Sequence, residues 1–327
     1  MKPILKVQNL SKDFIKSLDL VAKGLNRIGQ NYKQEVVHAV DDVNFSIFKG
    51  EIVGVVGESG CGKSTLGRMV AGILSPSKGS VEFDSSQANN KEIPSALRTQ
   101  MIFQDPFSSL NPRKRVVDII TEAPIYHKLI PPSEKRAFAT EMLQRVGLDP
   151  DTLERYPHQF SGGQRQRVGI ARALAVSPEF LVCDESIAAL DVSIQAQIIN
   201  LFVDLKDKFD LTYLFISHDI GVIEHISDRV IVMYLGRIVE TAPIETFVKQ
   251  PNHPYTQALL TGVPRLEVGK RQYEPISGEI PSPLSPPTGC HFHPRCNFAT
   301  ARCKAEKPAL REIAPAHFSA CHLNDEA

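Results

Sequence analysis

The chain alternates short runs of apolar residues with longer stretches in which apolar residues recur at helical spacing. EIVGVVG (51–57), FLVCDE (180–185) and YLFISHD (213–219) are apolar at most positions, a pattern typical of strands buried on both faces of a parallel sheet. EKRAFATEMLQRVGL (134–148) shows helical periodicity instead. We therefore predict an α/β fold over residues 1–250, in which mostly parallel strands alternate with helices.

Two segments of the sequence differ in composition from this α/β pattern. Residues 16–35 are polar and contain glycine and asparagine, which predicts a surface excursion near the N-terminus. PISGEIPSPLSPPT (275–288) contains five prolines and predicts an extended, stiff tether. A cysteine-bearing tail follows it. We therefore divide the chain into a domain at 1–250, a helical and proline-rich linker at 251–288, and an extension at 289–327.

Composition and charge exclude some classes of function. The chain has 37 basic and 37 acidic residues, so it lacks the broad basic face of a nucleic-acid-binding protein, and we expect no nucleic-acid partner. No apolar run reaches the roughly 18 residues of a membrane helix. The N-terminus becomes polar at Gln8, before the apolar region of a signal peptide could form. We expect a cytosolic protein whose cysteines are kept reduced.

GESGCGKST (57–65) has the pattern of a phosphate-binding loop and lies between an apolar strand and a helical run. Its glycines allow the backbone to turn tightly, so that backbone N–H groups point at the β- and γ-phosphates of a nucleotide. Lys63 is expected to bridge these phosphates, and the Ser64 hydroxyl to reach Mg²⁺. The residues predicted to bind ATP in this loop are Gly57, Ser59, Gly60, Cys61, Gly62, Lys63, Ser64 and Thr65.

Two carboxylates directly follow the apolar run at 180–183. Asp184 is expected to face Mg²⁺ at the phosphate loop, and Glu185 to polarise the water that attacks the γ-phosphate. Taken alone, an acidic pair at a strand end is more often a cap or a solvated turn. The presence of the phosphate loop makes the catalytic interpretation the stronger one.

FSGGQRQRVGIARAL (160–174) places a serine and two glycines at the start of a helix, where backbone N–H groups form a second anion site. The string resembles the signature motif of ATP-binding cassette (ABC) ATPases. The resemblance implies a P-loop ATPase fold with a helical subdomain at about 105–178. It also implies ATP contacts from Ser161, Gly162, Gly163 and Gln164.

Further positions extend the resemblance to ABC ATPases. Gln104 in MIFQDP stands at the family's Q-loop, which implies a role in Mg²⁺ binding and catalysis. ALD (189–191) stands at the D-loop, and His218 in ISHD at the switch histidine. Phe14 stands where the family places an aromatic ring against adenine, although half of such residues near a strand end would belong to the core.

Two positions depart from the family pattern. Phe160 replaces the usual leucine before SGGQ, and Ser186 stands where proline commonly follows the catalytic glutamate. In the family both positions orient the chain without touching phosphate. We therefore expect little loss of activity from either departure.

ABC ATPases hold ATP between two cassettes, with the phosphate loop of one facing the SGGQ of the other. Because this chain has one copy of each motif, the resemblance implies a second ATPase subunit, and we favour a heterodimer over a homodimer. Three classes of function are open: an importer subunit, a soluble ABC ATPase and a non-catalytic scaffold. Soluble ABC proteins usually carry two cassettes or a long coiled coil, and intact Lys63, Glu185 and His218 argue against a scaffold.

Several strings resemble the ATP-binding subunits of dipeptide and oligopeptide importers, most of all the second, F-type ATPase of dipeptide permeases. The resemblance implies peptide uptake driven from the cytoplasmic face of the bacterial inner membrane. It also implies two permease subunits, on which residues 105 to about 160 dock, and a periplasmic or extracellular substrate-binding protein. The cargo, whether dipeptide, oligopeptide, glutathione or metal complex, is chosen by other chains. The strings are QDPFSSLNPRKRV (104–116), RYPHQFSGGQRQR (155–167), HPYTQALL (253–260) and GEIPSPLSPPTGC (278–290).

Four of the six cysteines lie in the extension: Cys290, Cys296, Cys303 and Cys321. Clustered thiols in a cytosolic protein are more typical of metal ligands than of disulfides. Zinc usually takes closely spaced cysteine pairs, whereas wide and uneven spacing suits a larger core such as a 4Fe–4S cluster. The resemblance to dipeptide-importer ATPases implies this cluster, with a structural role. Free thiols and zinc are the alternatives, and the histidines that keep zinc open are His291, His293, His317 and His322. Cys61, in the phosphate loop, and Cys183, in a strand, are not expected to be ligands.

Overall fold

The computed structural model describes residues 2–16, 34–84, 94–105, 109–188, 190–262 and 278–325. Three sequence predictions fall partly outside these residues: the surface excursion at 17–33, Ala189 of the predicted D-loop, and residues 263–277 before and within the proline-rich tether.

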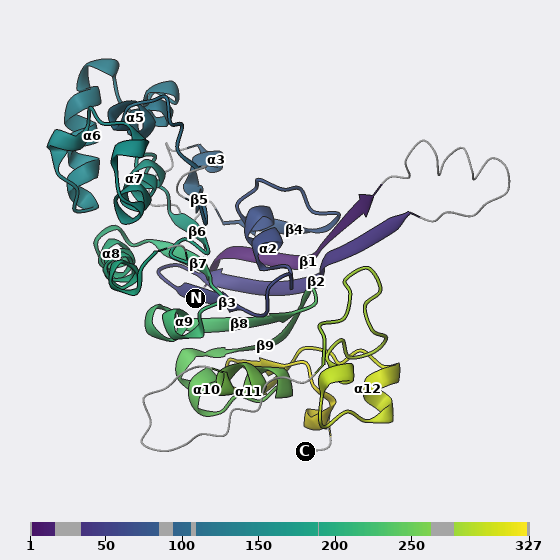
Figure 1. The fold of residues 1–327 in the computed structure, drawn as a ribbon. Helices are drawn as coiled ribbons and strands as arrows, with labels where there is room; N and C mark the ends of the chain where they lie inside the picture. The colour runs from purple at the N-terminus through teal and green to yellow at the C-terminus, as the bar shows by residue number, and fades with distance from the viewer. Residues whose placement is uncertain are drawn as a thin grey trace, which may run out of the picture.

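An eight-stranded sheet forms the centre of the molecule (Figure 1). Five neighbouring strands within it are parallel, and three of them contain the apolar runs of the sequence. The predicted α/β class is therefore confirmed. From one edge to the other, the strands are β10 (Arg311–Ala314), β11 (His317–Ser319), β9 (Arg237–Pro243), β8 (Arg229–Tyr234), β3 (Ile52–Val56), β7 (Thr212–Ile216), β6 (Phe180–Asp184) and β5 (Thr99–Ile102).

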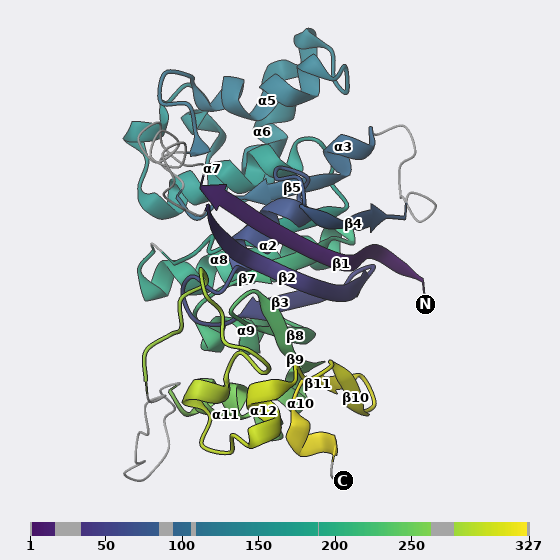
Figure 2. The same cartoon turned by 90° about the vertical axis from the view of Figure 1, so that its right-hand side faces the viewer.

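A second, antiparallel sheet lies over one face of the first (Figure 2). Its order is β2 (Glu35–Phe48), β1 (Pro3–Lys16) and β4 (Lys78–Phe83). Helix α2 (Lys63–Val70) contacts strands of both sheets, and its buried side chains share one core cluster with them. The helix that follows the phosphate loop is thus held between two layers.

The main core cluster is a separate one, formed by buried side chains of helices and of strands of the central sheet. One group of helices stands at one end of the molecule, opposite the extension (Figure 1). Short 3₁₀ turns begin at Pro132, Pro150 and Pro157, where proline at the first position suits a helix start. The helices outside the extension are α3 (Ser95–Arg98), α5 (Val116–Tyr126), α6 (Lys135–Arg145), α7 (Gly162–Leu174), α8 (Val192–Phe209), α9 (Ile220–Ile226), α10 (Ile244–Lys249) and α11 (Pro254–Thr261).

The cysteine-bearing extension is part of the central sheet. Strand β11 pairs antiparallel with β9, with Phe318 opposite Thr241, and β10 then pairs with β11. The rest of the extension contains α12 (Ala301–Ala305) and 3₁₀ turns at His293–Arg295 and His322–Asp325. The sequence led us to expect a tethered tail, and it did not predict that the tail extends the sheet.

A buried carboxylate joins the extension to the ATPase core. Glu240 on β9 is fully buried and accepts hydrogen bonds from the backbone N–H groups of Asn252 and His253, both at 2.8 Å. Its Oε1 also lies 2.7 Å from Nε2 of His317, which is itself buried. One side chain therefore connects β9, the start of α11 and strand β11.

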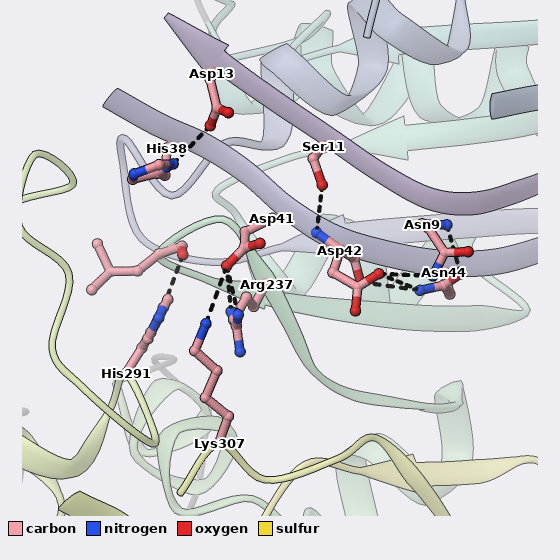
Figure 3. A network of polar contacts seen from close by, with 11 residues as sticks. Asn9, Ser11, Asp13, His38, Asp41, Asp42, Asn44, Arg237, His291 and Lys307 are labelled. Atoms are coloured by element: carbon pink, nitrogen blue, oxygen red, sulfur yellow. Dashed lines mark hydrogen bonds and ion pairs between the residues drawn. The ribbon is translucent and has the colours of Figure 1, made fainter. Parts of the chain in front are cut away.

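A second polar contact lies where the extension meets β2 (Figure 3). Asp41 Oδ2 accepts from Arg237 Nε at 2.9 Å and Nη2 at 2.6 Å, and lies 3.9 Å from Lys307 Nζ of the extension. Burial raises the pKa of Asp41, but the hydrogen bond from Arg237 and the nearby positive charges, those of Arg237 and Lys307 first, together leave the pKa below its ordinary value. Nearby, Nδ1 of His291 lies 3.2 Å from the Leu235 carbonyl oxygen.

We expect Glu240→Gln to loosen the extension. Because the substitution removes the charge and points an amide N–H₂ at buried donors, it should lower the free energy of extension docking by about 3 kcal/mol. Protease cleavage within 289–325 measures this effect. Glu245→Gln is the control: its side chain is 82% exposed and pairs only with Lys249 one turn away, so we expect a change below about 0.5 kcal/mol. Parent-like protease resistance in Glu240→Gln would mean that strand pairing alone holds the extension.

Candidate active site

The phosphate loop, residues 57–65, runs from the end of β3 into α2. A Cβ on Gly62, where φ is +105°, would lie 2.1 Å from the Ala39 carbonyl oxygen, and one on Gly57 would lie 2.2 Å from that of Met233. Backbone from two other elements therefore presses against the loop and fixes its path. Among the remaining predicted loop residues, Ser59 and Gly60 are exposed, Cys61 is buried and Thr65 lies in the first turn of α2.

Lys63 folds back over its own loop. Its side-chain Nζ donates to the carbonyl oxygens of Gly57 at 2.8 Å and Glu58 at 3.1 Å, and the residue is 4% exposed. The ammonium group is thus held at the loop by two neutral acceptors. A phosphate oxygen would replace them with a charged acceptor, which makes a stronger hydrogen bond.

Ser64 and Asp184 meet between α2 and the end of β6. Ser64 Oγ donates to Asp184 Oδ1 at 2.7 Å. Burial raises the pKa of Asp184, while the hydrogen bond from Ser64 and the charge of Arg68 oppose that rise. A hydroxyl and a partly buried carboxylate side by side are the oxygen ligands that Mg²⁺ prefers, so these residues fit the ion predicted here.

Glu185, Gln104 and His218 come together beside this pair. Gln104 Nε2 donates to Glu185 Oε2 at 2.8 Å, and His218 Nδ1 lies 3.6 Å from Glu185 Oε1. The three residues follow β5, β6 and β7, which are adjacent parallel strands. Their carboxyl ends therefore share one edge of the sheet.

Glu185 adopts an unusual backbone conformation. Its φ is +46°, a left-handed value that costs a non-glycine residue on the order of 1–3 kcal/mol and is concentrated at functional sites. Its N–H donates to the Ile216 carbonyl oxygen at 3.0 Å. The neighbouring strand β7 thus helps to hold the strained residue in place.

The signature residues do not join this group. Ser161 caps α7: its Oγ accepts from the Gln164 N–H at 3.3 Å, and its own N–H donates to Gln164 Oε1 at 3.0 Å. Gly163 packs against Ile194 and Gly162 against Leu190. Within the described ranges, no hydrogen bond links 161–164 to the phosphate loop, so one chain does not bring the two motifs together.

The predicted adenine contact and the two departures from the family pattern occupy different surroundings. Phe14 on β1 lies opposite Val37 and is 43% exposed, with Lys12 Nζ 5.5 Å from its ring centroid. Its ring is therefore accessible on the small sheet and does not belong to the core. Phe160 and Ser186 are both buried, and Phe160 packs in the main core cluster.

The four thiols of the extension line one small cavity of about 20 Å³ together with His253, His293 and His322. Burial raises the pKa of Cys290 to about 11 and raises the pKa of Cys296 and Cys321 above the ordinary value. Across the part of the chain that the structure describes, no three His, Cys, Asp or Glu side chains are placed so as to hold a metal ion. The 4Fe–4S cluster is thus not supported by an assembled metal site and stays a prediction.

Most of the histidines that kept zinc open have structural partners. Nδ1 of His291 faces the Leu235 carbonyl oxygen, and Nε2 of His317 faces Glu240. Both ring nitrogens of His322 are engaged, one with Asp325 and one with the Glu306 carbonyl oxygen. His293 Nδ1 lies 2.9 Å from the Cys290 carbonyl oxygen. These contacts leave the thiols as the main candidate ligands around the cavity.

Sequence reasoning missed three residues at the phosphate loop. Glu58 within the loop is contacted by Tyr255 of α11 and by Arg295 of the extension. The contacts span 197 and 237 residues of sequence, and no local pattern predicts them.

The sheet, the phosphate loop and the three residues at the strand ends define an ATPase of the ABC class. The family model described as "ABC transporter" matches residues 40–188, and that described as "Oligopeptide/dipeptide transporter, C-terminal region" matches 239–303. The chain belongs to the ATP-binding proteins of oligopeptide and dipeptide ABC transporters.

Two relatives illustrate the relationship. The chain is 51% identical over 295 residues to the oligopeptide transport ATP-binding protein AppF of Bacillus subtilis, covering 88% of this chain and 90% of AppF. It is 49% identical over 300 residues to YkfD, a putative oligopeptide transport ATP-binding protein of the same organism, covering 89% and 91%.

Solved structures agree with the fold. The ATP-binding cassette MJ0796, in a dimeric post-hydrolysis state bound to ADP and Pi, matches with a TM-score of 0.60 and 26% identity over 73% of this chain and 98% of that one. The cassette cbiO1 of Clostridium perfringens, part of the transporter complex cbiONQ, also matches with a TM-score of 0.60, at 27% identity over 77% and 93%. The predicted P-loop ATPase fold is confirmed. None of the helices in the described part of the chain combines the length and apolar character needed to cross a bilayer.

Two loop glycines provide a matched pair for a stability test. Gly62→Ala places a Cβ against the Ala39 backbone and should lower the free energy of unfolding by at least about 3 kcal/mol. Gly60 has φ +79° but open space where a Cβ would lie, so Gly60→Ala should cost only about 1 kcal/mol. Urea unfolding of the nucleotide-free chain measures both. Equal losses would contradict the role assigned to the Ala39 contact.

Proposed function

We propose that this chain is the ATP-hydrolysing subunit of a peptide importer, bound to the cytoplasmic face of the bacterial inner membrane. The observation that carries the proposal is the Glu185 carboxylate, held by Gln104 and close to His218 at the strand ends beside the phosphate loop. Relatives named for oligopeptide transport, which match most of the chain, support peptides as the cargo. They give no support to a soluble, non-transport ABC ATPase.

Lys63 binds the β- and γ-phosphates of ATP, exchanging the loop carbonyls for phosphate oxygens. Ser64 and Asp184 would hold Mg²⁺, with Gln104 as a further ligand. When bound, the ion neutralises charge on the phosphates and orients them for attack. The predicted loop residues contribute mainly backbone N–H groups, and Phe14 offers its exposed ring to adenine.

Glu185 takes the role of the general base. Its carboxylate accepts from Gln104 and is 19% exposed on its side chain, so a water can reach it. His218, whose side chain is 57% exposed and lies 3.6 Å from Glu185, contacts the γ-phosphate in this proposal. The two residues therefore orient and activate the attacking water.

A second ATPase subunit completes the site. Ser161 and Gly163 head a helix whose N-terminal N–H groups suit a phosphate, yet no described hydrogen bond joins them to their own phosphate loop. The dimeric state of the MJ0796 cassette supports the pairing of two such domains. We favour a heterodimer with a related subunit, docked through residues 105 to about 160 on two permease subunits that receive cargo from a binding protein.

The test of this function is Glu185→Gln in the assembled complex. The substitution keeps the shape of the side chain but removes the base, so hydrolysis should fall roughly 10²- to 10⁴-fold while ATP binding survives. Lys63→Ala should weaken ATP binding itself. The rate of ATP turnover and the affinity for a fluorescent ATP analogue are the two measurements. Parent-rate turnover by Glu185→Gln would remove Glu185 from the mechanism.

The extension is further assigned a 4Fe–4S cluster with a structural role. Four thiols line one cavity, His291, His317 and His322 have other partners, and the wide, uneven spacing of the cysteines along the chain favours a core larger than zinc. Cys290, Cys296, Cys303 and Cys321 would hold it as thiolates. Such a core supplies a covalent staple to a segment with few core-forming residues.

Anaerobically purified protein should contain about four iron and four sulfide per chain. Cys303→Ser should lose the iron and leave the extension sensitive to protease, because one of four thiolates is removed. Cys61→Ser is the control, since Cys61 lies in the phosphate loop, and it should keep the iron. Stoichiometric zinc without sulfide would replace the cluster with the zinc alternative and would leave the ATPase assignment intact.

A further inference from the structure

The extension reaches the phosphate loop through one ion pair. Arg295 Nη1 donates to Glu58 Oε2 at 2.7 Å, and Nη2 donates to Glu58 Oε1 at 2.9 Å. The Arg295 side chain is 4% exposed and that of Glu58 is 21% exposed. A bidentate ion pair of this kind fixes the orientation of the guanidinium and carboxylate groups as well as their separation.

The backbone of Glu58 is held at the same time. Its N–H donates to the hydroxyl oxygen of Tyr255 at 2.8 Å, and its carbonyl oxygen accepts from Lys63 Nζ at 3.1 Å. Glu58 thus has a partner for its side chain, for its N–H and for its carbonyl oxygen. Two of these partners, Tyr255 and Arg295, come from α11 and from the extension. Residues outside the phosphate-binding motif therefore help to fix the conformation of the loop that binds the triphosphate.

Arg295 is itself supported from behind by aromatic rings. The rings of Tyr234, Tyr255 and Phe292 lie within 4.7–5.3 Å of one another between centroids. Arg295 Nη1 also lies 3.4 Å from the Tyr234 hydroxyl oxygen, and its guanidinium carbon is 5.9 Å from the centroid of that ring. Because these rings come from β8, α11 and the extension, the ring that the guanidinium group contacts, Tyr234, is itself held by packing between three segments.

The charge of Glu58 makes this arrangement significant. A carboxylate inside a loop that binds a triphosphate repels the ligand unless a cation compensates it. Lys63 cannot serve both purposes, since its ammonium group is needed by the phosphates. We infer that Arg295 is a positioning residue for ATP binding: it neutralises Glu58 and holds the carboxylate toward the extension, so that the loop presents N–H groups and Lys63 to the phosphates.

A purely structural role for the pair makes a different prediction. If Arg295 only tied the extension to the ATPase core, its loss would loosen residues 289–325 and leave ATP affinity unchanged. If it compensates charge at the loop, its loss would weaken ATP binding, and removing the Glu58 charge would restore it. Hydrolysis at saturating ATP should change little in either case, because neither residue touches the group that activates water.

The experiment compares four variants of the full-length chain: Arg295→Met, Glu58→Gln, the double variant and Arg311→Met. Methionine keeps much of the length of the arginine stem without its charge. Arg311 is the control because it lies in the same extension and pairs at 2.7 Å with Asp325, a residue of the extension and not of the phosphate loop. Equilibrium binding of a fluorescent ATP analogue, KM and kcat in the assembled complex, and protease resistance of 289–325 are measured for each.

Arg295→Met should weaken analogue binding and raise KM roughly tenfold with kcat within about twofold of the parent. The double variant should bind the ATP analogue with an affinity within about threefold of that of the parent. Arg311→Met should bind the analogue with the affinity of the parent. The double variant separates the two roles even if Arg295→Met loosens the extension. It lacks the ion pair as Arg295→Met does, but it also lacks the Glu58 charge, so restored ATP binding would show that the uncompensated charge had caused the loss. Unchanged affinity in Arg295→Met, or weak binding that Glu58→Gln does not relieve, would overturn the inference.

Discussion

Hydrogen bonding between adjacent parallel strands is the constraint on which the rest of the structure depends. Strands β5, β6 and β7 lie side by side in register, so the residues that follow them must emerge at one edge of the sheet. Gln104, Glu185 and His218 are separated by up to 114 positions along the chain, counted from 104 to 218, and meet because of this order. The same ladder supplies the Ile216 carbonyl that holds Glu185 at its strained φ.

Parts of this arrangement could be predicted from the sequence because they are local. The phosphate loop is a contiguous pattern between a strand and a helix, and apolar runs at 51–57, 180–185 and 213–219 are long enough to mark buried strands. The meeting of Gln104 with Glu185 was not visible in any local pattern. Gln104 is a candidate only through its resemblance to the Q-loop of ABC ATPases, and its contact with Glu185 depends on the pairing of β5 with β6.

The strands of the extension could not be predicted from the sequence, for a physical reason. REIA (311–314) and HFS (317–319) are short and show little alternation, so they have weak strand propensity of their own. Their strand conformation depends on β9, whose edge offers unpaired backbone groups until β11 covers it. A tertiary partner thus determines these strands, and the sequence of the extension alone does not contain that information.

Polar pairs, more than apolar area, determine where the extension docks. Few of its apolar side chains are fully buried, Phe292 and Ala320 among them, whereas Glu240 with His317 and Glu58 with Arg295 are largely shielded from water. Such pairs give limited net stability, because burying charge is costly, but they penalise any other docking position strongly. Placement of the extension is therefore specific.

The same contrast applies to the candidate active site. Within this chain, Lys63 is held by loop carbonyls, the Asp184 carboxylate by Ser64 and the Glu185 carboxylate by Gln104. Ser161 instead uses its hydroxyl to cap α7, where it accepts a hydrogen bond from the Gln164 N–H. Under the proposed pairing of two ATPase subunits, the strained Glu185 is therefore held in place within one chain, and the partner supplies the signature helix.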